Sequence, residues 1–336
     1  MICHLQRIGA LDKMHLHHNK ELFKDAILAA SQRFGIPEIY MEKDYWVTLV
    51  LYEIFHSNMA DQIVFKGGTS LSKCHQLIYR FSEDIDLVIL RNEWENDNQL
   101  KKKIRQISKI TEDVMPEIHV EGLTNKKGNI RKTVHKYKKL FDGNFGQVRD
   151  QLVLEATWFG NYEPFTIESV SSYLFDIINF TGRDDVIKEY DMQPFEVQAL
   201  SVERTFCEKV MSLVRFSWMD DPYEALSNKI RHIYDLHFML ENKSIDMFFK
   251  SDNFFKMLQK VGKDDFISYK NNNTWLKEHP CTAIIYRAPE MTWDRIKNTY
   301  RTTFKDLVIG DLPDENNLVD SLKKIKARMD LFDWKI

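Results

Sequence analysis

Apolar side chains between residues 20 and 34 recur at every third or fourth position. This periodicity predicts a helix, and Gly35 is the kind of residue that ends one. Pro37 suits the first turn of a second helix over residues 37–56. The next apolar run, residues 63–65, is too short for a helix and predicts a buried strand.

The pattern beyond residue 65 changes character near residues 185–197. Before that stretch it predicts a turn at Gly67-Gly68, a helix over 70–77, a strand over 85–90, a basic amphipathic helix over 98–115, a hairpin and long loop over 116–150, and strands over 153–159 and 173–180. After Pro194 it predicts helices over 200–217, 228–242, 245–261, 291–307 and 315–331. We therefore predict an α/β (α+β) fold, with N-terminal helices and a mixed sheet in residues 1–190 and a helical C-terminal domain in residues 191–336 that contributes to a shared cleft.

Composition agrees with a folded globular protein. Of the 336 residues, 43% are hydrophobic and 12% are aromatic, which supports a sizeable core. The four cysteines, at positions 3, 74, 207 and 281, form no CxxC pair, so neither a zinc ribbon nor a disulfide framework is indicated. We expect a cytoplasmic protein with no membrane partner, because no stretch resembles a signal peptide or a membrane span. His15, His17 and His18 are expected to be solvated rather than metal ligands.

Positive charge is concentrated in two runs, although the formal net charge is only −3. Residues 101–109 hold five lysines or arginines, and residues 126–139 hold seven with no acid. Such runs are usually solvated surfaces, but they also suit contact with a phosphate backbone. Tyr137 lies within the second run and is a candidate for stacking on a base.

The segment after the strand at 63–65 has the features of a phosphate-binding turn. Gly67 and Gly68 allow a sharp turn, and their N–H groups, with the start of the following helix, can meet a phosphate. Thr69 and Ser70 add hydroxyl donors at the same place. A glycine pair alone is more often a plain loop.

Asp84 and Asp86 interrupt the apolar strand predicted over 85–90. Residues two apart on a strand leave from one face, so both carboxylates can share a divalent cation. Buried like charges are costly without a cation, and magnesium prefers a few carboxylates together with phosphate oxygens. An Asp-x-Asp alone is commonly a solvated strand edge. Its position one short helix after the glycine turn favours a two-metal site for phosphoryl chemistry.

These segments resemble a known family. GGTSL followed by SEDIDL is similar to the hG[GS]…[DE]h[DE] signature of the DNA polymerase β-like nucleotidyltransferase superfamily. More narrowly, the chain resembles the AbiEii/AbiGii toxin family, related to the MenT-type tRNA nucleotidyltransferase toxins. The resemblance covers roughly residues 38–242 and rests on five segments: EKDY at 42–45, FKGGT at 65–69, RFSEDIDL at 80–87, FCEKV at 206–210 with Arg215, and RHIYDL at 231–236.

The resemblance implies a toxin of an abortive-infection or toxin–antitoxin system that uses an NTP and has an antitoxin partner encoded nearby. Some members transfer a nucleotide to the 3′ end of tRNA. By motif, Asp84 and Asp86 would bind Mg²⁺, with Mn²⁺ as an alternative. Lys66, Lys209 and Asp235 would complete the catalytic site, and the residues that would hold phosphate are Gly67, Gly68, Thr69, Ser70, Arg80 and Ser82.

Several of these residues have a second interpretation. Lys66 would contact the triphosphate or be a rim lysine, and Lys209 would reach into the cleft or snorkel from an apolar helix face. Asp235 would act in the site or pair with Arg231, four residues earlier on the same helix.

The remaining candidates are equally open. Arg80 would bind phosphate or brace a neighbouring acid, either Glu83 or Asp84. Ser82 would contact nucleotide or, more simply, cap the approach to the strand. Glu155 is the candidate third metal ligand, on a later strand, and Asp44 is expected to support the site from outside it.

The favoured reaction is transfer of NMP from NTP to an acceptor hydroxyl, with tRNA as acceptor. Two alternatives remain at this point: nucleotide transfer to a protein or a small molecule, and a nucleic-acid-binding module with a vestigial site. The basic runs argue against a small acceptor, and the intact acid pair argues against a vestigial site.

Overall fold

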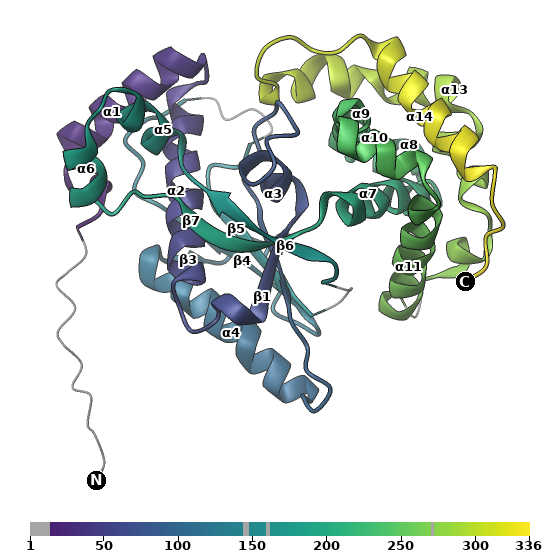
Figure 1. The fold of residues 1–336 in the computed structure, drawn as a ribbon, viewed down its shortest axis with the longest axis horizontal. Coiled ribbons are helices and arrows are strands. Elements are labelled where there is room, and N and C mark those ends of the chain that lie inside the picture. The colour runs from purple at the N-terminus through teal and green to yellow at the C-terminus, as the bar shows by residue number, and fades with distance from the viewer. Residues whose placement is uncertain (1–13, 144–147, 159–161, 270–271) are drawn as a thin grey trace.

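The computed structural model describes residues 14–143, 148–158, 162–269 and 272–336. Within these ranges one mixed sheet of seven strands runs in the order β3-β4-β5-β2-β1-β7-β6 (Figure 1). β1 pairs in parallel with β7, β2 pairs in parallel with β5, and the other neighbours are antiparallel. The strands are β1 (Ile63–Lys66), β2 (Ile85–Ile89), β3 (Glu117–Ile118), β4 (Ile130–His135), β5 (Leu152–Thr157), β6 (Phe165–Val170) and β7 (Phe195–Leu200). The predicted α/β fold with a mixed sheet and a helical C-terminal region is confirmed.

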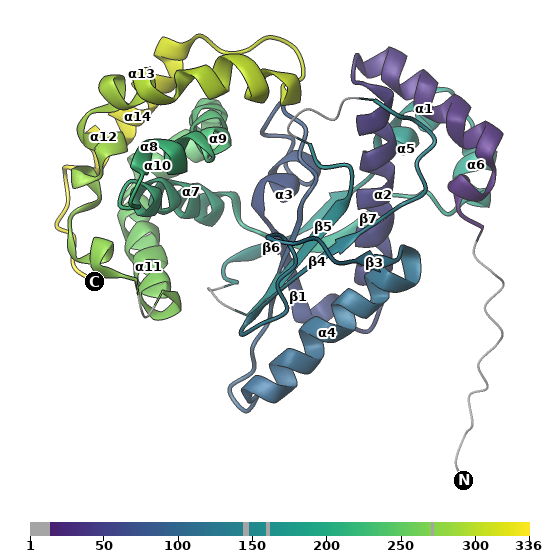
Figure 2. The same ribbon diagram turned by 180° about the vertical axis from the view of Figure 1, so that it is seen from behind.

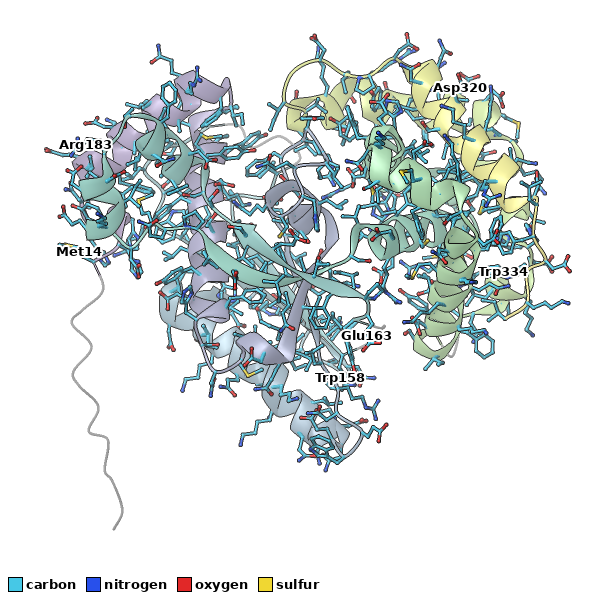
Figure 3. All side chains as sticks on the ribbon, in the orientation of Figure 1. Met14, Trp158, Glu163, Arg183, Asp320 and Trp334 are labelled. Atoms are coloured by element: carbon cyan, nitrogen blue, oxygen red, sulfur yellow. The ribbon has the colours of Figure 1, made fainter. Side chains whose placement is uncertain are left out.

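The helices fall into two groups along the chain (Figures 1 and 2). Those up to residue 190 are α1 (Lys20–Phe34), α2 (Glu38–Phe55), α3 (Gly67–Lys73), α4 (Asp97–Val114), α5 (Tyr173–Phe180) and α6 (Asp184–Glu189). Those beyond the sheet are α7 (Val202–Phe216), α8 (Pro222–Ser227), α9 (Ile230–Glu241), α10 (Lys243–Lys250), α11 (Asp252–Ser268), α12 (Ile284–Arg287), α13 (Pro289–Thr299) and α14 (Glu315–Met329). The chain end returns to this second group, where the Trp334 indole N–H donates to the carbonyl of Leu276 at 2.7 Å (Figure 3).

Local sequence accounts for the ends of the helices that flank the sheet. Asn19 caps α1 by accepting from the N–H of Leu22, and Gly35 ends it in the left-handed region at φ +67°. Asn96 and Gln99 form a capping box at the start of α4. These signals are readable from sequence, and both helices were predicted.

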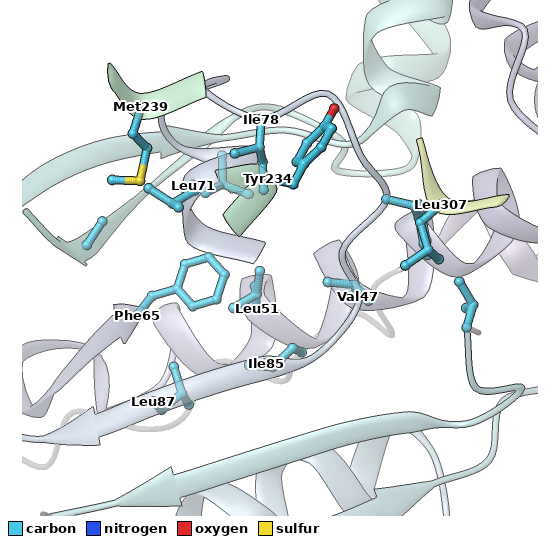
Figure 4. Packing of buried hydrophobic residues seen from close by; sticks show 14 of the residues in the cluster. Val47, Leu51, Phe65, Leu71, Ile78, Ile85, Leu87, Tyr234, Met239 and Leu307 are labelled. Carbon is cyan, nitrogen blue, oxygen red and sulfur yellow. The ribbon is translucent and has the colours of Figure 1, made fainter. Parts of the chain in front are cut away.

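The two faces of the sheet differ in chemistry. Phe65 and Leu87 face the main hydrophobic core, together with Val47 and Leu51 of α2 (Figure 4). Among the described residues, the opposite face carries a small apolar cluster of Val64, Val88 and Leu200, with partly buried hydrophobic side chains packed against it. Because side chains alternate along a strand, residues that sit between core positions must face away from α2 and α4. That second face is where charged side chains gather.

Helix α2 carries a buried lysine that supports the strand β2 region. Lys43 is fully buried and pairs with Glu83, which directly precedes Asp84. Its ammonium also donates to the carbonyl of Gln151 at 2.7 Å, while the N–H of Arg149 donates to Glu83 at 3.0 Å. A buried charge needs such complete pairing. Lys43 therefore ties α2 to the two segments that enter β2 and β5.

The residues on either side of Lys43 anchor further segments. Glu42 accepts hydrogen bonds from the backbone N–H groups of residues 140 and 141. Asp44 accepts from the Lys73 ammonium at 2.6 Å and from the Tyr173 N–H at 3.0 Å, so it joins the end of α3 to the start of α5. Asp44 thus supports the structure from outside the cleft, as expected from the sequence.

Two predictions for the region between residues 173 and 200 are wrong, and one strand, β6, was missed. Residues 173–180 form α5 rather than a strand, because Ser172 caps a helix that buries Leu174, Ile177 and Ile178 on one side. Strand β6 was missed because most of its residues are exposed or half-buried. The chain after Pro194 is a strand, β7, before it becomes helical, so the sheet extends to residue 200 and the division at 190/191 remains a prediction.

Smaller differences concern element ends. The helix predicted over 70–77 is α3, which begins at Gly67. The helix predicted over 245–261 is divided at Ser251, whose hydroxyl caps α11. The helix predicted over 291–307 is α13, which ends at Thr299 and is followed by a π-helical turn, Tyr300–Phe304. Residue 159, the predicted end of a strand, lies outside the described residues.

The histidines near the N-terminus are not all solvated. His17 is partly buried, its Nδ1 lies 2.8 Å from the Tyr45 hydroxyl, and its ring packs 4.6 Å from that of Trp46. Burial lowers the pKa of His17 to about 4. His17 thus packs against α2. Cys74, Cys207 and Cys281 are free thiols, and Cys3 lies outside the described residues. Among the helices that the structure describes, none combines the length and apolar character that a membrane crossing requires.

Replacing Lys43 by methionine should destabilise the fold by about 3–5 kcal/mol, because Glu83 would remain buried without its cation. Urea unfolding followed by circular dichroism measures this loss. Lys24→Met on the exposed side of α1 is the matched control and should change stability by less than about 0.5 kcal/mol. Equal stabilities of the two variants would contradict the role of the Lys43–Glu83 pair.

Candidate active site

Four charged side chains form a row across the second face of the sheet. Lys66 of β1 is in register with Asp86 of β2, Asp86 with Glu155 of β5, and Glu155 with Lys132 of β4. Residues in register on neighbouring strands share a face. The row lies in a cleft of about 650 Å³ between the sheet and the helices after residue 200. The row therefore places two neighbouring carboxylates between two lysines on the floor of this cleft.

Asp86 is the central acid of the row. Its desolvated position, with Glu155 and Asp84 nearby, raises its pKa to about 7. Lys66 and Lys132 only partly offset this effect. A Cβ added at Gly67, where φ is +84°, would overlap the Asp86 carboxylate. Glycine at 67 is therefore needed for the start of α3 to approach this acid.

Asp84 lies immediately before the first residue of β2 and also lines the cleft. The Arg149 guanidinium donates to its carboxylate, with Nη1 3.2 Å from Oδ1. The hydroxyl of Thr69 donates to the backbone carbonyl of Asp84 at 2.6 Å. Arg149, which sequence reasoning missed, thus holds one of the two predicted metal ligands, and Thr69 joins α3 to β2.

The second glycine also allows a close approach. A Cβ at Gly68 would lie 2.7 Å from Nη2 of Arg80 and 3.0 Å from the hydroxyl of Ser82. Ser82 is in turn 3.0 Å from the Thr69 hydroxyl. Gly67, Gly68, Thr69, Arg80 and Ser82 all line the cleft, and their contact with phosphate stays a prediction. Ser70 is buried and is not part of the cleft lining.

Arg80, Lys209 and Asp235 form one buried ionic group. Both carboxylate oxygens of Asp235 accept from Arg80 at 2.7 Å, and Oδ2 also accepts from the Lys209 ammonium at 2.7 Å. Although burial opposes ionisation, Arg80 and Lys209 hold the pKa of Asp235 at about 2. Arg80 and Lys209 line the cleft, whereas Asp235 lies behind them. Asp235 therefore pairs with Arg80 and Lys209 rather than with Arg231. Arg80 in turn pairs with Asp235 rather than with Glu83 or Asp84.

Lys66 belongs to a second chain of ion pairs. Its ammonium lies 3.3 Å from Glu208 of α7, which also pairs with Arg204 at 3.0 Å, and Arg204 reaches Asp264 of α11 at 2.8 Å. Glu208 stands next to Lys209 in the sequence, and both line the cleft. The paired Lys66 is thus neither a free rim lysine nor an isolated phosphate ligand.

Three further cations line the helical side of the cleft: Arg215 of α7, Lys229 just before α9, and Arg231 within it. None of the three forms an ion pair within the part of the chain that the structure describes. The Arg215 guanidinium lies 4.4 Å from the centre of the Tyr269 ring. Burial, with Arg231 and Arg215 nearby, lowers the pKa of Lys229 to about 8. Such crowding of positive charge favours binding of an anion.

The basic run at 126–139 is largely used within the protein. Lys132 pairs with Glu155 at 3.4 Å and Lys139 with Asp150 at 2.6 Å. Tyr137 is only 3% exposed and stacks against Trp46, so the prediction that it stacks on a base is wrong. Burial raises its pKa well above the usual range.

The acids fit a magnesium ion only in part. Among the described residues, no three His, Cys, Asp or Glu side chains stand close enough to form a complete metal site. Yet Asp84 and Asp86 lie in one cleft, and burial together with the nearby Glu155 and Asp84 raises the pKa of Asp86. Magnesium commonly takes one or two carboxylates and completes its shell with phosphate oxygens and water. This donor set fits an ion that binds together with a triphosphate.

A family model described as "Nucleotidyl transferase AbiEii toxin, Type IV TA system" matches residues 49–327. The chain belongs to this AbiEii family. The match contains every candidate site residue from Lys66 to Asp235, and the predicted family resemblance is confirmed. Membership makes the chain a nucleotidyltransferase toxin and implies an NTP substrate and an antitoxin partner.

Two other comparisons are less informative than the AbiEii match. No curated protein matches the chain. Among solved structures, the chain is similar to MenT4, a nucleotidyltransferase toxin from Mycobacterium tuberculosis H37Rv, with 13% sequence identity and a TM-score of 0.44. That similarity covers 91% of this chain and 98% of the other.

The Asp235 group gives a testable pH dependence. Asp235→Asn should cost about 3–5 kcal/mol at neutral pH, because Arg80 and Lys209 would remain buried without a counter-charge. The wild-type carboxylate has a folded-state pKa of about 2, below its ordinary 3.8, so its stabilisation is present above pH 4 and is lost as the pH falls towards 2. The stability difference between wild type and variant should therefore narrow over that window in urea titrations.

The control for Asp235→Asn is Asp246→Asn, which removes an exposed pair with Lys250 on α10. This change should cost less than about 0.5 kcal/mol at any pH. A constant gap between wild type and Asp235→Asn from pH 5 to pH 2 would contradict the assignment of a paired, ionised Asp235.

Proposed function

We propose that this AbiEii-family chain transfers NMP from an NTP to the 3′-hydroxyl of tRNA and releases pyrophosphate. The observation that carries the proposal is the cleft itself, where three acids, Asp84, Asp86 and Glu155, share one space with three cations that have no ion-pair partner among the described residues, Arg215, Lys229 and Arg231. Charge neutralisation and positioning are the main requirements of phosphoryl transfer. The two sides of the cleft supply these requirements separately.

The triphosphate would bind between the start of α3 and the helical wall. Gly67 and Gly68 let the backbone approach the phosphates closely, and Thr69 fixes this turn to Asp84. Arg215, Lys229 and Arg231, which have no ion-pair partner among the described residues, would meet the phosphate oxygens. Lys209 and Arg80 add positive charge behind them, held in place by Asp235.

Asp84 and Asp86 would hold Mg²⁺, with Mn²⁺ as an alternative, and Glu155 is the candidate ligand for a second ion. When bound, the metal would polarise the α-phosphate and lower the pKa of the attacking hydroxyl. Arg149 orients the Asp84 carboxylate, and Lys132 partly offsets the charge of Glu155. Asp235 has no access to the cleft in this arrangement and serves as a positioning residue.

Transfer of the nucleotide is tested first by incubating the protein with magnesium, each labelled NTP in turn, and total tRNA. We expect label on tRNA with the intact protein and a loss of at least about 1,000-fold with Asp84→Ala/Asp86→Ala. Equal circular dichroism and nucleotide binding without metal show that the variant is folded.

The outcomes of this assay separate the candidate acceptors. Label on protein or on a small molecule, but not on tRNA, would overturn the tRNA assignment and keep the transferase. Nucleotide binding without transfer to any acceptor would support a vestigial site. Label on tRNA that survives loss of both acids would place the chemistry elsewhere in the molecule.

The cationic wall gives a separate prediction. Arg231→Ala should raise the KM for NTP about tenfold to hundredfold, the effect of losing one charged hydrogen bond, with a smaller change in kcat. Arg287→Ala, an exposed arginine on α12, is the matched control and should leave the KM unchanged. A lower kcat at constant KM would assign Arg231 to the transition state rather than to nucleotide binding.

A further inference from the structure

A second cation-lined hollow lies outside the cleft. It has a volume of about 210 Å³ between α4 and the turn that leads into β4. Its charged lining consists of Lys101 and Arg105 from α4 and of Lys126 and Arg131 from the hairpin, and Ile104 and Gly128 complete it. No acid is among the residues that line it. The hollow therefore has the charge and the size for a phosphate group.

The charges around this hollow are only partly neutralised. Lys126 and Arg131 share a single acid, Glu117. Lys101 and Arg105 form no ion pair within the described ranges of the chain. They are four residues apart on one helix, where like charges repel each other. An anion in the hollow would relieve this repulsion and accept from guanidinium and ammonium donors together.

The position of the hollow relates it to the cleft. Along β4, Ile130 and Lys132 line the cleft, whereas Arg131 points to the other face and donates from Nε to the Ser108 hydroxyl of α4 at 2.8 Å. The two binding surfaces are thus separated by one strand. α4 and the helices around α7 lie on different sides of the sheet (Figures 1 and 2).

The strand between the two surfaces is near the edge of the sheet. β3 pairs with β4 only at residues 134 and 135, and near the cleft a single bridge joins Asn125 to Lys132. A long polyanion could therefore pass from the cleft around this edge to the hollow. A free nucleotide is too small to occupy both surfaces.

We propose that the hollow lined by Lys101, Arg105, Lys126 and Arg131 binds a backbone phosphate of the acceptor RNA, while the end of that RNA occupies the cleft. This inference rests on the proposed function and adds a second contact to it. The contact concerns the phosphate and carries no base specificity. It explains how a protein with an overall negative charge would hold an RNA.

The test compares Lys101→Gln/Arg105→Gln with Lys102→Gln/Lys109→Gln. Both variants remove two positive charges from α4, but residues 102 and 109 are exposed and lie outside the hollow. tRNA binding is measured without NTP over a range of salt concentrations. We expect the first variant to weaken binding about tenfold and to reduce the slope of log K against log salt by about 1 to 2. The control should change much less, and the KM for NTP should be unchanged in both.

Equal binding by the two variants would overturn the inference, as would a wild-type protein that binds no tRNA. Matching thermal unfolding of the two variants excludes misfolding as the cause of a difference. Failure of the proposed function has a different result from failure of this inference. If the proposed function fails, the hollow would bind tRNA, but no label would pass from NTP to tRNA. Failure of the inference alone would show as labelling of tRNA that neither variant impairs.

Discussion

The buried group of Arg80, Asp235 and Lys209 is the interaction on which the cleft between the sheet and the helices depends. Arg80 precedes the acidic strand β2, whereas the other two residues come from helices α9 and α7. Breaking such a buried pair typically costs about 3–5 kcal/mol, so the helical wall is held over the sheet by charge as well as by apolar packing. Backbone hydrogen bonds add to this junction, since Phe81 donates to Leu307 at 2.7 Å and Ile309 to Tyr79 at 2.9 Å.

The same principle operates on the other side of the sheet. The consecutive residues Glu42, Lys43 and Asp44 are buried in α2, and each satisfies a different segment of chain. A helix in a hydrophobic core normally excludes such charges, because each one costs several kcal/mol unless it is paired. Here the pairing fixes the segments that lead into β2, β5 and α5. Buried ion pairs thus fix the cleft from two sides of the sheet: those of Lys43 and Asp44 on α2, and those of Asp235 with Arg80 and Lys209.

Charged side chains of both signs are concentrated in the cleft, which the net charge of the whole molecule does not reveal. The cleft lining contains nine lysines or arginines and six aspartates or glutamates, although the chain as a whole has a net charge of −3. Three of the acids belong to the sheet side and three to the helices α7 and α11. The cations without an ion-pair partner among the described residues, Arg215, Lys229 and Arg231, belong to the helical side. A triphosphate with its metal needs both signs at short range. This local concentration of both signs explains why overall charge is a poor guide to the function of an AbiEii-family toxin.

The sequence by itself determined the local parts of this protein. The glycine pair, the acids Asp84 and Asp86, most helices and the family could be predicted, because caps, spacing and short motifs act over a few residues. The segment at 173–180 could not be assigned, since a short, mainly apolar run of eight residues fits a strand or a helix until packing decides. The ion-pair partners of Asp235 and Lys66, the roles of Arg149 and Glu208, and the burial of Tyr137 were decided only by the tertiary structure. Each depends on contacts between residues far apart in the chain, and a local sequence pattern cannot predict such contacts.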